Sequence, residues 1–386
     1  MQLTRARIGL VATLACAGAG LSLAAPATTW AAIEMLEDQA ADALMQYFTD
    51  SDKVSVRSLI GSCSVALRSN TTMSFQWNNE HVTIPAIDAP AGSPEAVDAI
   101  TTASRPIAGN AYSDFNKVRN EITAGAVRGG TSVSYYISSE TDYLGQQLAA
   151  SHNKSFMDEK WNASVGGSYG WDRIEPVADD DTNTGADTKT TLHWNVVGTR
   201  VVSPTMLLRM GVEYNLVSGL QHNPYRNVYA GGTNVPERHP DHRSRSDVFV
   251  RFNKYMNNRS SAKLSYRLYG DDWGIISHEV GARLSQYVRR GLFASYEYRW
   301  YTQSAADFYR PEYETTSGVD GYLSGDYRMA ELASHLFGFG LNFDLDAFTD
   351  GGGWTSPMAL KFNYERYFNS NNYTASFLTT QLTYRF

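Results

Sequence analysis

The chain has 386 residues, a formal net charge of −7, 19% charged residues and 12% aromatic residues. Ordinary globular domains contain about 25% charged residues, so this chain is poor in charge and rich in aromatic side chains. The acidic balance argues against a nucleic-acid partner, which would require a basic face. Two cysteines are too few for a disulfide framework or a zinc ribbon, and no Cys-x-x-Cys-His haem motif occurs. We therefore expect no cofactor.

Residues 1–31 are typical of a secretory signal peptide. Arg5 and Arg7 give a basic start, and an uncharged apolar run follows over residues 8–25. Small residues then offer cleavage sites after Ala25 or Ala31. We predict an exported protein with a signal peptide over 1–31 and a single mature domain over 32–386.

Past this segment the chain repeats stretches in which every second residue is apolar. Between Met206 and Leu216 the even positions are apolar, whereas Arg209 and Glu213 lie on the odd positions. The stretch from residue 292 to residue 300 shows the same alternation. Successive side chains of a strand point to opposite faces, so each stretch predicts a strand with one apolar and one polar face.

Three features favour a membrane barrel over a soluble β-sandwich. The polar faces carry charges that a sandwich core could not bury unpaired. Short and long connections alternate, as they do in outer-membrane barrels. The last strand ends in Tyr384 and Phe386, which resembles the carboxy-terminal signal that the barrel-insertion machinery of Gram-negative bacteria reads. We predict an all-β, antiparallel up-and-down transmembrane β-barrel in the outer membrane, closed because lipid leaves no partner for a free sheet edge.

The predicted barrel has sixteen strands, with roughly fourteen as the alternative number. Their approximate ranges are 41–50, 53–67, 71–86, 114–127, 131–143, 146–156, 159–174, 188–201, 205–219, 243–256, 260–270, 273–288, 291–303, 329–346, 356–369 and 372–386. Tight turns at 69–70, 128–130, 257–258, 289–291 and 350–353 share one rim, and the long connections 87–113, 175–187, 220–242 and 304–328 share the other. An even strand number places both termini in the periplasm. We expect aromatic girdles to include Trp171, Trp194, Trp273 and Trp300.

Several loop and strand-end motifs resemble an uncharacterised family of proteobacterial outer-membrane barrels, catalogued as a domain of unknown function. They are Asn223-Pro224-Tyr225-Arg226, Val235 to Pro240, Tyr266-Arg267 with Asp272-Trp273-Gly274, Tyr301 to Tyr309, and the loop from Val97 to Ser104. The resemblance covers roughly residues 40–386. It implies the barrel fold and the membrane location and leaves the activity open. It also implies a genomic context of small lipoproteins and redox-associated secreted proteins.

Charged residues recur on the polar face of the strands between residues 205 and 303. They are Arg209, Glu213, Arg251, Arg267, Glu279, Arg283, Glu297 and Arg299. On neighbouring strands such side chains lie within reach of one another. Two interpretations stay open, a charged lumen that selects solutes and a set of paired charges that braces the inner wall. Pairing would leave the wall nearly neutral, with a mild anion preference.

The connection 220–242 is the most unusual stretch of the sequence. His222, Glu237, His239, Asp241 and His242 are residue types that bind zinc or copper, but their spacing matches no closed metal site. We expect a packed constriction or lid rather than a metal site. The candidate constriction residues are Tyr225, Arg226, Glu237, Arg238, His239 and Asp307.

The sequence thus predicts a channel or transport conduit for small polar solutes. The alternative is a structural barrel with a lumen plugged by loops, which scaffolds an exported lipoprotein or redox protein. We expect no enzyme, because period two directs His278 to lipid while its neighbours Ser277 and Glu279 point inward. Expected partners are outer-membrane lipid, lipopolysaccharide and the insertion machinery, with a periplasmic protein or lipoprotein as a further candidate.

Overall fold

The structure, a computed structural model, describes residues 36–51, 53–67, 70–84, 115–176, 185–348 and 357–385. The predicted signal peptide, most of the predicted connections 87–113 and 175–187, the turn 350–353 and Phe386 lie outside the described residues. The described residues contain no helix that is long and apolar enough to cross a membrane.

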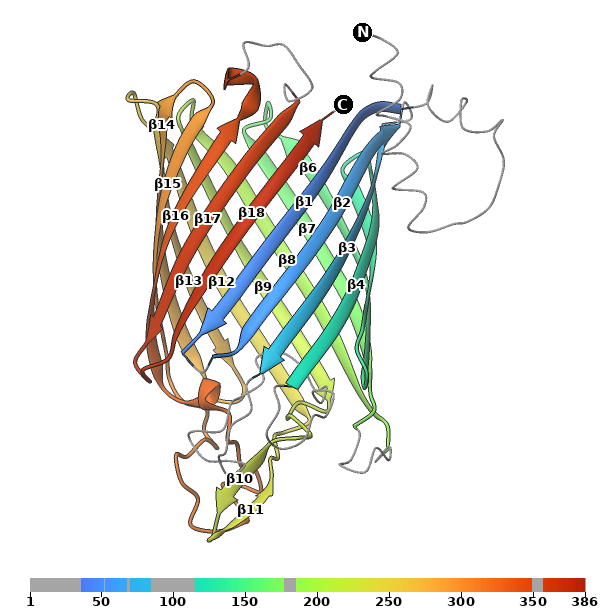
Figure 1. Ribbon diagram of the computed structural model, residues 1–386, viewed down its shortest axis with the longest axis vertical. Coiled ribbons are helices and arrows are strands. Elements are labelled where there is room, and N and C mark those ends of the chain that lie inside the picture. The colour runs from blue at the N-terminus through green and yellow to red at the C-terminus, as the bar shows by residue number, and fades with distance from the viewer. Residues whose placement is uncertain are drawn as a thin grey trace, which may run out of the picture.

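Sixteen antiparallel strands close into a barrel, which confirms the predicted fold and strand number (Figure 1). Closure occurs between the first and last strands, where Ala40 lies opposite Arg385 and Asp50 opposite Ala375. The barrel strands are β1 (Leu36–Asp50), β2 (Ser55–Leu67), β3 (Thr71–Ile84), β4 (Phe115–Arg128), β5 (Thr131–Ser139), β6 (Tyr143–Phe156), β7 (Trp161–Ile174), β8 (Asp187–Ser203), β9 (Met206–Gly219), β12 (His242–Tyr255), β13 (Ser260–Asp271), β14 (Ile276–Arg289), β15 (Leu292–Gln303), β16 (Leu332–Asp344), β17 (Met358–Asn369) and β18 (Thr374–Arg385).

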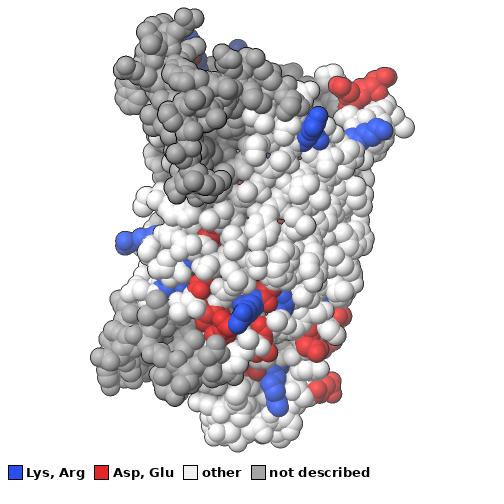
Figure 2. Space-filling model, turned by 90° about the vertical axis from the view of Figure 1, so that its right-hand side faces the viewer, with Lys and Arg blue, Asp and Glu red and all other residues white. Residues whose placement is uncertain are grey.

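Apolar side chains cover the outer wall of the barrel. On β12, Val248 is 53% exposed, whereas its neighbours Asp247 and Phe249 are buried on the inner face. Figure 2 shows that much of the visible wall carries no charge and that charged residues gather near one end. An apolar surface of this extent is unfavourable in water and favourable against lipid hydrocarbon. The molecule is therefore an outer-membrane β-barrel.

The two rims differ in the length of their connections (Figure 1). β1 begins and β18 ends at the rim with the short turns, which we call the turn rim. There Asn70, Gly129, Gly130 and Gly291 have positive φ angles, as tight turns require. The long connections leave the opposite, loop rim, as the alternation of short and long connections predicted.

Two connections of the loop rim fold against each other. Residues 220–241 contain the hairpin β10 (Asn227–Ala230) and β11 (Thr233–Pro236), and residues 304–331 contain the short 3-10 helix η1 (Tyr327–Met329). Backbone hydrogen bonds join Arg238 and Leu323 in both directions, at 3.0 and 2.9 Å. Val228, Ala230, Tyr313 and Leu323 form a buried apolar cluster between the two connections. We call residues 220–241 and 304–331 together the loop cap.

One predicted girdle residue lies elsewhere. Trp273 belongs to the connection between β13 and β14 and is buried at 4% exposure, so its assignments to a strand and to an outer girdle were wrong. The Asp271 carboxylate accepts hydrogen bonds from the backbone N–H groups of Trp273 and Ile275, at 3.1 and 2.9 Å. Because of this turn, β14 begins at Ile276 rather than at the predicted residue 273, and the indole lies beneath the cap in a cluster with Ile275, Ala306 and Phe308.

Candidate functional site

The predicted lumen residues lie on the inner face of β9 and β12 to β15, opposite in phase to the exposed apolar side chains. Most of them form ion pairs between strands that are neighbours or, for Arg267 and Glu213, are separated only by β12. The pairs are Arg267 with Asp247 at 2.6 Å and with Glu213 at 3.9 Å, Arg283 with Glu297 at 3.6 Å, and Arg299 with Glu279 at 4.0 Å. We call these residues, with Arg209 and Arg251, the lumenal belt.

The belt charges remain accessible inside the barrel. The side chains of Arg267, Arg299 and Glu297 are 46%, 42% and 37% exposed. Ion pairs with this exposure contribute only about 0–1 kcal/mol each, because water screens them. Within the described chain, Arg209 and Arg251 take part in none of the ion pairs, and the Arg251 guanidinium lies 4.8 Å from the Phe249 ring centroid. The belt therefore carries both signs of charge with a small positive surplus.

A buried carboxylate connects the two halves of the loop cap. Glu237 is 1% exposed and accepts hydrogen bonds from Ser324 Oγ at 2.7 Å and from the Gly325 backbone N–H at 3.0 Å. The Asn223 N–H and the Arg226 guanidinium approach its other oxygen, at 3.3 and 3.4 Å. Glu237 thus receives donors from both 220–241 and 304–331.

These contacts keep Glu237 ionised. Burial alone would raise the pKa of this carboxyl. The hydrogen bond from His239 and the positive charge of Arg226 outweigh burial and lower the pKa from 4.5 to about 2. The cap is therefore held by a charged group that is fully ionised at neutral pH.

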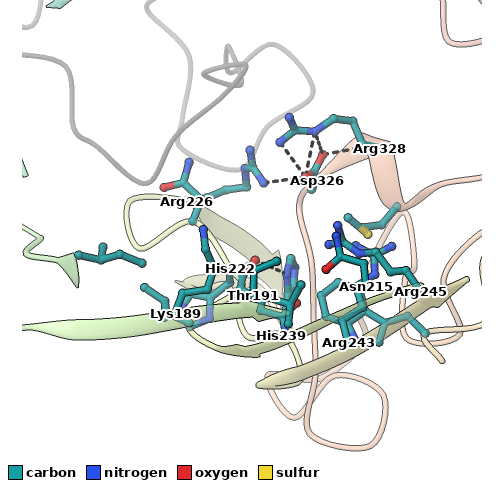
Figure 3. A pocket seen from close by; sticks show the side chains of 17 residues that line it. Lys189, Thr191, Asn215, His222, Arg226, His239, Arg243, Arg245, Asp326 and Arg328 are labelled. Atoms are coloured by element: carbon teal, nitrogen blue, oxygen red, sulfur yellow. Dashed lines mark hydrogen bonds and ion pairs between the residues drawn. The ribbon is translucent and has the colours of Figure 1, made fainter. Parts of the chain in front are cut away.

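Beneath the cap lies a cavity of about 340 Å³ (Figure 3). It is bounded by the loop-rim ends of β8, β9 and β12, by residues 220–226 and by η1. Its lining includes five cationic side chains, Lys189, Arg226, Arg243, Arg245 and Arg328. We call it the basic cavity.

Acidic partners surround most of these cations. Lys189 pairs with Asp172 at 3.0 Å, and Arg243 Nε donates to Asp271 at 2.9 Å. Figure 3 shows Asp326 between Arg226 and Arg328, which approach it at 3.3 and 2.8 Å. Burial acts to raise the pKa of Asp326, but the hydrogen bond and charge of Arg328 lower it, so this carboxyl is also ionised.

The alternating pattern of β12 places Arg243 and Arg245 on the inner face, although they were not among the predicted lumen residues. Both side chains share the phase of Asp247 and Arg251 on β12, so period two directs them inward. The predicted strand 243–256 already contains both residues, at the end of this inward row. Arg243 also lies over the Trp273 ring, with its guanidinium carbon 4.1 Å from the centroid.

The candidate constriction residues separate into two groups. Arg226, Glu237 and His239 lie at the basic cavity or directly behind it, and Tyr225 donates to Asp142 on the β5–β6 connection. Arg238 and Asp307 are exposed on the outside of the cap. Arg238 donates to the Thr316 carbonyl at 2.6 Å, so it joins the two connections and does not line the cavity.

The histidines of the cap serve packing and hydrogen bonding. His239 Nε2 lies 2.9 Å from Ser324 Oγ, and its ring centroid lies 5.3 Å from that of Trp273. His222 lines the cavity, and burial followed by the charge of His239 lowers its pKa. Among the described residues, no three His, Cys, Asp or Glu side chains are grouped to hold a metal ion.

Comparison with known proteins gives a family match and several similar folds. A family model described as "Protein of unknown function (DUF3570)" matches residues 9–374. No curated protein matches the chain. Similar solved structures include OpdK of Pseudomonas aeruginosa with vanillate (8% identity, TM-score 0.43, covering 90% of this chain and 98% of that one). OccK11 (OpdR) of Pseudomonas aeruginosa is 11% identical with a TM-score of 0.42, and the match covers 90% of this chain and 95% of that one. OccAB4 of Acinetobacter baumannii is 8% identical with a TM-score of 0.37, and the match covers 91% of this chain and 98% of that one.

Proposed function

The chain belongs to the DUF3570 family, whose function is unknown, and from its own lumen we propose that it is an outer-membrane channel for small polar solutes. The observation that carries this proposal is the accessibility of the lumenal belt. Arg267 and Arg299 keep more than two fifths of their side-chain surface exposed in the barrel interior. Sixteen strands enclose a lumen too wide for side chains alone to fill. A water-filled lumen lined by fixed charges is what a polar solute needs in order to cross the membrane through a barrel.

The pathway has two successive parts. A solute from the loop rim first meets the basic cavity beside η1, where the cap narrows the mouth. It then passes the belt, where arginine and acidic side chains offer both donors and acceptors. Because most belt charges are paired and exposed, they replace part of the solute's hydration without holding it tightly.

Single-channel recording on the refolded mature chain in a planar bilayer tests this proposal. We expect steady openings whose conductance rises with salt concentration, and a reversal potential in a salt gradient that indicates weak anion preference. A folded barrel that stays silent would overturn the channel proposal. The scaffold for a lipoprotein or redox protein would then become the working hypothesis, with copurification of a periplasmic partner as its test.

A further inference from the structure

We propose that the basic cavity binds a small organic acid with one carboxylate and an apolar body. This inference deepens the proposed function, because it names the solute class of the same pathway. It starts from the charges of the cavity. Four acidic residues, Asp172, Glu237, Asp271 and Asp326, pair with four of the five lining cations, and Arg245 is the cation that remains.

Arg245 forms no ion pair or side-chain hydrogen bond within the described residues, and its Nε atom is buried without a partner. The nearest acid in the sheet register is Asp271 on β13. Its Oδ2 accepts from Arg243 Nε at 2.9 Å and from the Tyr269 hydroxyl at 2.8 Å. Its Oδ1 accepts from two backbone N–H groups of the following turn. Both carboxylate oxygens of Asp271 therefore already accept hydrogen bonds from other groups. The charge of Arg245 remains without an acidic partner at the wall of the cavity.

Other polar atoms beside Arg245 also lack partners. Asn215 faces Arg245 across the β9–β12 register, and its Oδ1 atom is buried without a hydrogen bond (Figure 3). The Nε2 donor of Gln221, which lines the cavity from the cap, is buried and unbonded as well. Buried polar groups are normally satisfied, so these atoms mark a place for a polar ligand. A guanidinium beside the amide donor of Gln221 is an arrangement that recognises a carboxylate, and the Asn215 Oδ1 atom can accept a hydrogen bond from a ligand donor.

Part of the remaining lining is apolar, beside the polar side chains of Thr191, His222, Asn223 and His239. Ile174, Val217 and Trp273 are 1%, 5% and 4% exposed, and Leu220 and Met329 complete this side of the cavity. A volume of about 340 Å³ suits a small organic molecule rather than an inorganic ion. One unpaired cation matches one negative charge, so a second carboxylate would be desolvated without a partner. The cavity therefore favours an organic monoanion over phosphate.

Isothermal titration of the detergent-solubilised, folded chain with benzoate tests this site, and benzamide provides the neutral isostere. We expect saturable benzoate binding and no measurable benzamide binding. Arg245→Gln should weaken benzoate binding at least about tenfold, because it removes a charge-assisted hydrogen bond. This substitution breaks no ion pair in the described chain, so the barrel and the cap should remain folded. Inorganic phosphate should not compete with benzoate.

Arg290→Gln is the matched control, because Arg290 is an exposed arginine of the β14–β15 turn on the opposite rim, outside both the cavity and the belt. It should bind benzoate as the unaltered chain does. Equal benzoate affinity in Arg245→Gln, equal affinity for benzamide, competition by phosphate at the same concentration, or no saturable binding by the folded chain would each overturn the site. Conductance separates the two proposals. A conducting barrel without benzoate binding retains the channel and loses the site, whereas a silent barrel that binds benzoate does the reverse.

Discussion

The lumenal belt and the basic cavity use the same residue types and share strands β9 and β12, yet their charges lie in different surroundings. Arg267 in the belt has a side chain that is 46% exposed, whereas Arg243 in the cavity is 9% exposed. Water screens the belt pairs, so an unpaired belt arginine such as Arg251 costs little. The cap buries the side chains of the cavity, where an unpaired cation is costly and therefore informative. A missing partner therefore indicates a ligand only where the charged group is buried.

The burial of the cavity arginines depends on the docked cap. The largest expected effect therefore comes from removing Glu237, which joins the two connections of the cap. Glu237→Ala removes the acceptor for Ser324 and Gly325 and one partner of Arg226. Removing one member of a buried, charged network costs about 3–5 kcal/mol. We expect the cap to undock, the side chains of the cavity to become exposed and the conductance to rise. Limited proteolysis of the cap and single-channel recording check this result.

Glu312→Ala is the control for that substitution, because Glu312 is exposed on the same cap connection. It should leave protease resistance and conductance unchanged. If Glu237→Ala keeps a protease-resistant cap, the hydrophobic cluster around Leu323 holds the connections together without the carboxylate. The cavity and the belt would then owe their difference to apolar packing alone.

Acid should reproduce part of the same effect without a mutation. The pKa of Glu237 is about 2 in the docked cap, against 4.5 for the ordinary group. A lowered pKa stabilises docking fully above about pH 4.5, and the contribution is lost as the pH falls toward 2. The difference corresponds to about 3 kcal/mol. Hydrogen exchange of the cap amides at pH 7 and pH 3, each compared with the intrinsic exchange rate at that pH, should show lower protection factors at pH 3.

Glu237→Gln separates this carboxyl from other acid-sensitive groups. Its cap amides should have lower protection factors than those of the unaltered chain at pH 7, and the loss of protection between pH 7 and pH 3 should be smaller. Asp326, whose pKa is also lowered, leaves a residual acid response in this variant. An undiminished loss of protection in Glu237→Gln would assign the acid response to Asp326 or to the barrel.

The barrel was predictable from sequence because its signal is local. Alternation along a strand sets which face each side chain takes, and that rule correctly orients Val248 and Asp247. The same rule reaches Arg245 by counting back from Arg251. The cap was less accessible, because its central hydrogen bond joins Glu237 to Ser324, 87 residues apart in sequence. Arg245 lacks a partner because Asp271 accepts hydrogen bonds from the backbone of the β13–β14 turn. The alternation of residues along a strand does not predict these hydrogen bonds.

The smallest expected effect is in the belt, where it sharpens the contrast with the cavity. Replacing Arg267 and Arg283 by Ser leaves Asp247, Glu213 and Glu297 without their cations, so the wall becomes negative. An exposed ion pair contributes about 0.2–1 kcal/mol. We therefore expect the ratio of cation to anion permeability to rise by about 1.4- to 5-fold. Reversal potentials in a salt gradient measure this change. Because the belt lies outside the cap, benzoate binding should not change in this variant. Unaltered reversal potentials in a conducting barrel would show that ions do not pass these side chains, and the pathway would have to run elsewhere in the lumen.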